Sequence, residues 1–298
     1  MKINEAFKKY SLVPVRYENI GKARIISTNR GKYVYKKGCV NAKILNYLKT
    51  RNFDYLPVFI NDYSDDFQIS EYLDDFDIPP EQKIIDMISL VALLHSKTTH
   101  YKEIDTEEYE QLYEDLDNNI TYLYSYYTDL ITIIESKVYM SPSEYLLARN
   151  IGAVYDCLDE CKIRLDVWHK LVSEKRKQRR VVLHNNLKLD HFIRNDNSYL
   201  ISWDKAKVDS PVFDLYKLYL NHVLDFNFND ILKIYEKNYP LMDDEKELFF
   251  ILISLPKIVD FKSSEYKNTK KINEAILQIY KTREFTKTSE SKKEKQVL

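Results

Sequence analysis

Short runs in which apolar and polar residues alternate fill the first seventy residues. Runs rich in β-branched and aromatic residues predict strands at residues 13–17, 22–28, 32–37, 56–60 and 67–72. A hairpin turn at 29–31 joins the second and third strands, and its Gly31 is expected to take a positive φ. Helical spacing of the apolar residues in 41–48 predicts one helix after the third strand. This order of elements predicts a small α+β unit.

After residue 74 the apolar residues recur at helical spacing instead. A helix is expected to begin at Pro79-Pro80-Glu81, and a long helical region follows over 106–172. Three more short strands are predicted at residues 181–183, 191–194 and 199–202. Helices resume over 212–280, with interruptions near Pro240 and Pro256. The fold class is therefore α+β, with a small β-rich part followed by a larger helical part.

Composition narrows the classes of function. The chain has 298 residues, 45 Lys and Arg against 46 Asp and Glu, and a net charge of -1, which argues against a nucleic-acid partner. The longest mainly apolar run, 248–255, is too short to span a membrane, so a soluble, cytoplasmic protein is expected. The 4 glycines exclude a G-x-G-x-x-G or Walker A loop.

Two smaller features have ordinary structural interpretations. Cys157 and Cys161 are spaced to share one helix face and are expected to be half-buried thiols, because too few nearby ligands complete a metal site. The basic run 175–180 is expected to be a solvated connector, and the acidic residues of 107–117 a solvated helix face.

The segment 181–215, VVLHNNLKLDHFIRNDNSYLISWDKAKVDSPVFDL, contains the most informative pattern for chemistry. A short strand ends at His184, a loop of polar residues follows, and a hairpin then leads to Ser202-Trp203-Asp204. A helix begins just before Asp214. Polar residues at the ends of hairpin-linked strands can assemble a site for phosphate and metal.

This segment resembles the catalytic and metal-binding segments of the protein-kinase-like fold. It is most similar to the aminoglycoside phosphotransferase and choline kinase family, and within it to the bacterial spore-coat kinase-like proteins. The family has a His-x-Asp-x-x-x-x-Asn loop, a hydrophobic-Asp-[Trp/Phe]-[Glu/Asp] strand and a Pro-x-x-Asp-Leu helix start. The corresponding stretches here begin at His184, Ile201 and Pro211.

The resemblance extends to the rest of the chain and implies a bilobal fold. Lys36, in Tyr-Val-Tyr-Lys, corresponds to the phosphate-binding lysine of the third strand, and Glu71 and Tyr72 lie where the hinge backbone faces adenine. The implied domains are an N-lobe over 1–73, a helical C-lobe over 74–281 that includes 181–215, and a polar tail over 282–298. The implied cofactors are ATP and Mg²⁺.

Three positions of the motif depart from the family pattern. Asn186 stands where the family has its catalytic Asp, and a neutral amide cannot accept the proton of an attacking hydroxyl. His191 replaces the metal-binding Asn, and its imidazole is a poor ligand for a hard cation. Ser202 replaces the metal-binding Asp and removes a full negative charge. No acidic residue lies between Gly38 and Lys49 to pair with Lys36, so Asn41 is the nearest candidate partner.

Other residues of the segment offer partial substitutes. Asp204 can assist the metal, Asp190 is a candidate base, and Lys188 matches a phosphate-facing lysine of protein kinases. The resemblance gives His184 a structural role, since it hydrogen-bonds the loop backbone in the family. Asp214 is expected to accept backbone N–H bonds at the start of its helix and so to stabilise the loop.

Three hypotheses follow for the function. The favoured one is a pseudokinase that serves as a binding or scaffolding module, with an unidentified small-molecule or protein ligand. The second is an active ATP-dependent small-molecule phosphotransferase that uses Lys36, Asp190 and Asp204. The third is a helical interaction protein whose strands only mimic the kinase pattern.

Overall fold

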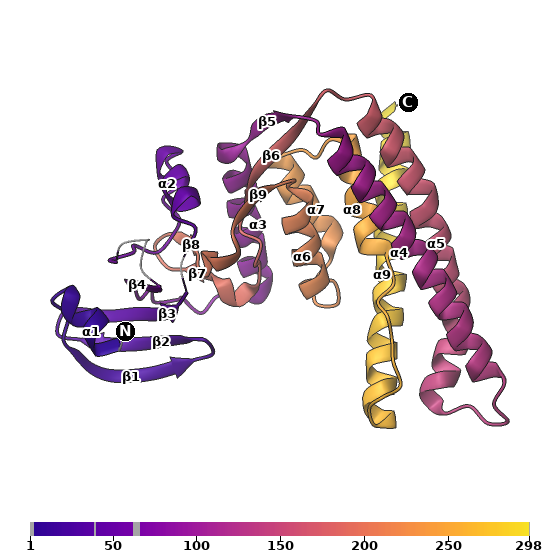
Figure 1. The fold of residues 1–298 in the computed structure, drawn as a ribbon, viewed down its shortest axis with the longest axis horizontal. Helices are drawn as coiled ribbons and strands as arrows, with labels where there is room; N and C mark the ends of the chain where they lie inside the picture. Colours follow the sequence, from indigo (N-terminus) through magenta and orange to yellow (C-terminus); the bar gives the residue numbers. More distant parts are fainter. Residues whose placement is uncertain (1–2, 39, 62–65, 298) are drawn as a thin grey trace. The chain divides into compact units, whose positions relative to one another are not determined.

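The N-terminal part of the chain forms an antiparallel sheet of four strands, in the order β1-β2-β3-β4 (Figure 1). We analysed a computed structural model, which describes residues 3–38, 40–61 and 66–297. The strands are β1 (Pro14–Ile20), β2 (Ala23–Thr28), β3 (Gly31–Lys37) and β4 (Phe67–Glu71). Gly31 closes the β2–β3 hairpin with a φ of 129°, so the positive φ expected there is confirmed.

Helix α1 (Ile3–Lys9), which the sequence pattern did not predict, covers one face of this sheet. Phe7 of α1 packs in a buried cluster with Ile26, Tyr35 and Ile69 of the sheet. Helix α2 (Ala42–Thr50) follows β3 as predicted, and Asn41 caps it by accepting a hydrogen bond from the Ile44 N–H.

The prediction of a strand at residues 56–60 is wrong, because no strand forms there. Among the described residues this stretch makes one isolated bridge, between Phe59 and Ser70 of β4, with flanking hydrogen bonds from the N–H groups of Ile60 and Glu71. Most of the turn predicted at 61–66 lies outside the described residues, as does Cys39.

Helix α3 and five short strands complete the part of the chain around the kinase-like motifs. Helix α3 (Pro80–Thr98) precedes strand β5 (His100–Glu103), and strand β6 (Lys177–Leu183) pairs with β9 (Lys207–Asp209). Strands β7 (Phe192–Arg194) and β8 (Ser198–Leu200) form the predicted hairpin. Thr98 accepts a hydrogen bond from the Val182 N–H and thereby ties α3 to β6.

The helical part consists of the elements α4 to α9. Their bounds are Thr106–Glu135 for α4, Pro142–Ser173 for α5, Val212–His222 for α6, Phe228–Asn238 for α7, Asp243–Ser254 for α8 and Glu265–Val297 for α9. Helix α5 packs against α4, α8 and α9, and begins with a capping box between Ser141 and Glu144. Helix α9 continues to Val297, so the predicted polar tail is helical.

The chain separates into two compact units. One consists of residues 1–100, 180–214 and 237–239, and the other of 101–179, 215–236 and 240–298. The first unit contains the sheet and residues 181–214 of the segment with the kinase-like motifs. The candidate site can therefore be described within one unit.

Two expectations about polar residues are corrected in the structure. Arg179 is only 8% exposed and pairs with Glu245, and Arg180 pairs with Asp209, so this part of the basic run is not a solvated connector. Cys157 and Cys161 are fully buried, and burial raises the pKa of both thiols. In the described residues no helix is long and apolar enough to cross a membrane.

Candidate functional site

A fully buried carboxylate, Asp214, holds the polar loop that follows β6. Its oxygens accept hydrogen bonds from the backbone N–H groups of His184 (2.8 Å) and Asn185 (2.7 Å), and from His95 Nε2 of α3 (3.2 Å). Burial raises the pKa of Asp214, but the hydrogen bonds and the nearby histidines outweigh this effect and lower it below its ordinary value. The backbone donors lie in the loop after β6 and not at the start of α6, where they were expected from the sequence, so Asp214 fixes the start of the loop.

His184 lies at the end of β6 and is also fully buried. Its Nε2 donates to the carbonyl of Ile201 (2.8 Å), and its ring makes an edge contact with Trp203 at 4.8 Å. Burial lowers the pKa of His184 to about 4, so the imidazole is neutral at physiological pH. A neutral ring that donates from Nε2 carries its lone pair on Nδ1, and this buried atom has no partner in the described residues.

The backbone turns sharply on both sides of the site. Asn185 and Ser202 are left-handed, with φ of 59° and 67°. Asn185 donates from its side chain to the Lys205 carbonyl (2.8 Å), and buried Trp203 donates from Nε1 to the Leu200 carbonyl (2.7 Å). These bonds hold the loop after β6 against the turn after β8.

Three of the predicted site residues, Asn186, His191 and Ser202, meet between these turns. His191 Nδ1 donates to the Asn186 carbonyl (2.6 Å), and Asn186 donates from its side chain to the Ser202 carbonyl (3.5 Å). All three are partly buried. The groups that the loop gathers are therefore an amide, an imidazole and a hydroxyl, none of which is a carboxylate.

Lys36 of β3 meets Asp204 of the same unit. The Lys36 ammonium lies 2.5 Å from an Asp204 carboxylate oxygen, with the side chains 19% and 31% exposed. Partial burial raises the pKa of Asp204, but the hydrogen bond and the charge of Lys36 lower it overall, so Asp204 is ionised. The partner of Lys36 is therefore Asp204 and not Asn41, whose side chain caps α2.

The other predicted residues are more exposed. Lys188 is exposed, and Asp190 is exposed within a short 3₁₀ turn at Leu189–His191.

At the end of β4, the N–H of Glu71 donates to the carbonyl of Val58, and the N–H of Tyr72 donates to the carbonyl of Lys32. The Lys32 ammonium also lies over the Tyr72 ring, 5.4 Å from its centre. These contacts join the hinge-like segment to the sheet.

The sequence identified the residues of this polar segment but not the hydrogen bonds that join them to α3. His95 of α3 contacts Asp214 directly, a partner that the sequence does not indicate. The burial of His95 was indicated, because it continues the buried stripe of α3 residues at 84, 88 and 91. Thr98, one turn further on, was not identified at all.

The side chains at this site determine which ions or ligands it can bind. Mg²⁺ prefers carboxylate oxygens, and Asp204, the carboxylate beside Lys36, is already engaged by that lysine. No group of three or more His, Cys, Asp or Glu in the described ranges is placed to hold a metal ion. The residues thus fit a magnesium ion poorly. Lys36 itself is suited to a phosphate group.

Comparison with solved structures identifies the fold of the chain. No family model matches the chain, and no curated protein matches its sequence. Among solved structures, an aminoglycoside phosphotransferase from Alicyclobacillus acidocaldarius matches with a TM-score of 0.72 and 11% identity, over 98% of this chain and 96% of that one. A spectinomycin phosphotransferase in complex with AMP matches with a TM-score of 0.57 and 12% identity, over 94% and 96%.

A choline kinase from Streptococcus pneumoniae also matches, with a TM-score of 0.50 and 16% identity over 92% of this chain and 97% of that one. These matches cover nearly the whole chain. The chain has the α+β, protein-kinase-like fold of the aminoglycoside phosphotransferases and choline kinases, as the sequence motifs predicted.

Proposed function

We propose that this protein is a pseudokinase, a kinase-like protein that serves as a binding or scaffolding module and does not transfer phosphate by the family's route. The observation that carries the proposal is the chemistry of Asn186, His191 and Ser202. The kinase resemblance expects a base and metal ligands at these positions, whereas the side chains that meet there are an amide, an imidazole and a hydroxyl. The loss of a positioned base alone costs about 10²–10⁴ in rate.

Nucleotide binding without turnover is compatible with the same residues. The spectinomycin phosphotransferase was crystallised with AMP, and Lys36 is a cation in the strand that the kinase resemblance assigns to phosphate binding. A phosphate group has to compete with Asp204 for the Lys36 ammonium. We therefore expect weak nucleotide binding that Mg²⁺ does not strengthen.

The resemblance to spore-coat kinase-like proteins and the lobe boundary near residue 73 stay predictions.

The test is a calorimetric titration of the full chain with ATP, with and without Mg²⁺, followed by an assay for transfer or release of the γ-phosphate. In the wild type we expect equal ATP affinities in both conditions and no turnover. The variant Asn186→Asp/Ser202→Asp restores two carboxylates, and Mg²⁺ is then expected to tighten ATP binding by about tenfold, or about 1.4 kcal/mol.

A matched control adds the same two charges elsewhere. Asn197→Asp/Ser173→Asp changes exposed positions and is expected to leave the Mg²⁺ response unchanged. Mg²⁺-dependent turnover by the wild type would reject the pseudokinase proposal.

The second candidate is an active phosphotransferase, and the contact between Lys36 and Asp204 is the observation in its favour. It brings a phosphate-binding cation and an ionised carboxylate together at one point. If this candidate is right, Asp204→Ala and Asp190→Ala each abolish transfer. Unchanged turnover in both variants would eliminate this mechanism.

A further inference from the structure

The two faces of the N-terminal sheet carry different residues. In the β2–β3 pairing, Arg24 lies opposite Tyr35 and Ala23 opposite Lys36. Because neighbouring strand residues point to opposite faces, Arg24 and Tyr35 share one face and Lys36 lies on the other. The same register, extended by one residue, places Lys22 opposite Lys37 on the face of Arg24.

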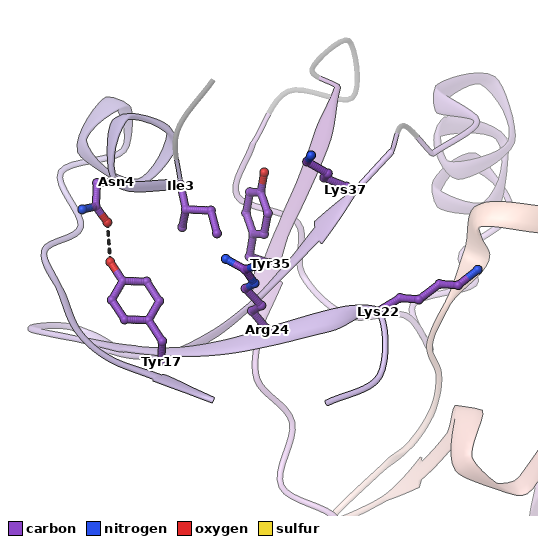
Figure 2. Close-up of a pocket in the computed structure, with 7 residues that line it drawn as sticks. All are labelled: Ile3, Asn4, Tyr17, Lys22, Arg24, Tyr35 and Lys37. Carbon is purple, nitrogen blue, oxygen red and sulfur yellow. Dashed lines mark hydrogen bonds between the residues drawn. The ribbon is translucent and has the colours of Figure 1, made fainter. Parts of the chain in front are cut away.

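A cavity of about 670 Å³ opens on the Arg24 face, beside helix α1 (Figure 2). Its lining includes three cations, Lys22, Arg24 and Lys37, and the phenol rings of Tyr17 and Tyr35. Tyr17 donates to the side chain of Asn4 and so joins β1 to α1. The volume lies in the range of about 300–1,000 Å³ that small-molecule sites occupy.

The three cations of this cavity lack acidic partners among the described residues. Within residues 3–38, 40–61 and 66–297, the side chains of Lys22, Arg24 and Lys37 form no ion pair or hydrogen bond. Lys36 on the opposite face, in contrast, is paired with Asp204. Figure 2 shows Arg24 and Lys37 near Tyr35, while the Lys22 side chain extends away from them. Cations without acidic partners on one wall attract an anion.

The donors on this wall are suited to phosphate in particular. An arginine side chain presents a planar fork of N–H groups that binds two phosphate oxygens at once. Tyr35 lies beside Arg24 and is almost wholly buried, and its hydroxyl has no hydrogen-bond partner in the described chain. Burial raises the pKa of Tyr35 and the nearby Arg24 charge lowers it, with a net increase, so the phenol keeps its proton as a donor.

We propose that this cavity binds a small anion with two or more phosphate groups, held chiefly by Arg24 and flanked by Lys22 and Lys37. This site is distinct from the proposed nucleotide site, because Lys36 lies on the opposite face of the sheet. Occupation of the cavity would also fill the gap between α1 and the strands, and would therefore stabilise the N-terminal sheet.

Calorimetric titration of the full chain with inorganic pyrophosphate, in about 150 mM salt to screen non-specific attraction, tests the proposal. We expect saturable binding that Arg24→Gln weakens by about tenfold and that Lys37→Gln weakens less. All three cations are exposed, so these variants are expected to fold, and a circular dichroism spectrum checks this.

Arg16→Gln is the matched control. Arg16 is an exposed arginine of the same sheet, and its pairing with Ser27 places it on the opposite face. The control is expected to bind pyrophosphate as the wild type does. An equal loss in Arg16→Gln would show non-specific attraction and overturn the proposal, as would the absence of saturable binding.

Lys36→Met separates this site from the proposed nucleotide site. We expect this variant to weaken ATP binding and to leave pyrophosphate binding unchanged. If it abolishes pyrophosphate binding while Arg24→Gln does not, the anion binds beside Lys36 and the proposal for the cavity is wrong. Binding of an acidic peptide such as oligoglutamate in place of pyrophosphate would also overturn it.

Discussion

The loop that follows β6 has a buried side and a partly exposed side, and they differ in chemistry. On the buried side, Asp214 and His184 keep the polar groups that hold the loop, with hydrogen bonds of 2.7–3.2 Å. On the other side, an amide (Asn186) and a hydroxyl (Ser202) lie where the resemblance leads one to expect carboxylates. The buried groups determine whether the loop folds, whereas the exposed groups determine only its chemistry. If the proposed function is right, a kinase-like fold persists here without the carboxylates of the family motif.

The largest effect is expected from Asp214→Asn. The amide would direct an N–H group at donors that now bind a carboxylate oxygen, and at least one buried donor would lose its partner. We expect the free energy of unfolding to fall by about 3 kcal/mol or more. Urea unfolding measures this value. If the free energy of unfolding falls as little as it does in a variant of an exposed Asp, the loop after β6 does not depend on Asp214.

A smaller effect is expected from acidification, through His184. Its pKa in the folded protein is about 4, lower than 6.5 in the unfolded chain, so between these pH values the unfolded state binds the extra proton. The stability that the neutral ring contributes is therefore present above pH 6.5 and is lost as the pH falls towards 4. One group with this shift contributes about 3 kcal/mol over that window.

Urea unfolding at a series of pH values tests this expectation. His184→Gln retains a donor for the Ile201 carbonyl but cannot titrate, so its stability should change less between pH 6.5 and 4 than that of the wild type. His169→Gln, at a histidine 35% exposed, should retain the wild-type dependence. Below this window the lowered pKa of Asp214 adds a further loss of stability, because its carboxylate is then protonated.

Local patterns predicted most elements, and the failures share one cause. The strands β2, β3 and β4 and the helices α2 and α3 follow from spacing and turn residues within each segment. The partners of Arg179 and Lys36 lie 66 and 168 residues away, so no local pattern identifies them. The stretch 56–60 has strand composition, but it makes one bridge only, because pairing depends on its neighbours in space.

For the site, the motif positions were predictable and their environment was not. The order of His184, Asn186, His191 and Ser202 was readable from the kinase-like segment. The cationic cavity was not, because Lys22, Arg24 and Lys37 are brought together by the register of β2 and β3 and by α1, a helix of seven residues without a strong apolar pattern.

The smallest effect is expected at Asp190, on the exposed side of the loop. Asp190→Ala removes an exposed carboxylate, so the free energy of unfolding should change by less than about 0.5 kcal/mol. Together with Asp214→Asn, this variant compares two carboxylates that flank the same loop and differ in burial. Urea unfolding of both variants under one condition measures the contrast. If Asp190→Ala costs as much as Asp214→Asn, burial is not what separates the two sides of the loop, and the exposed side contributes to folding as well.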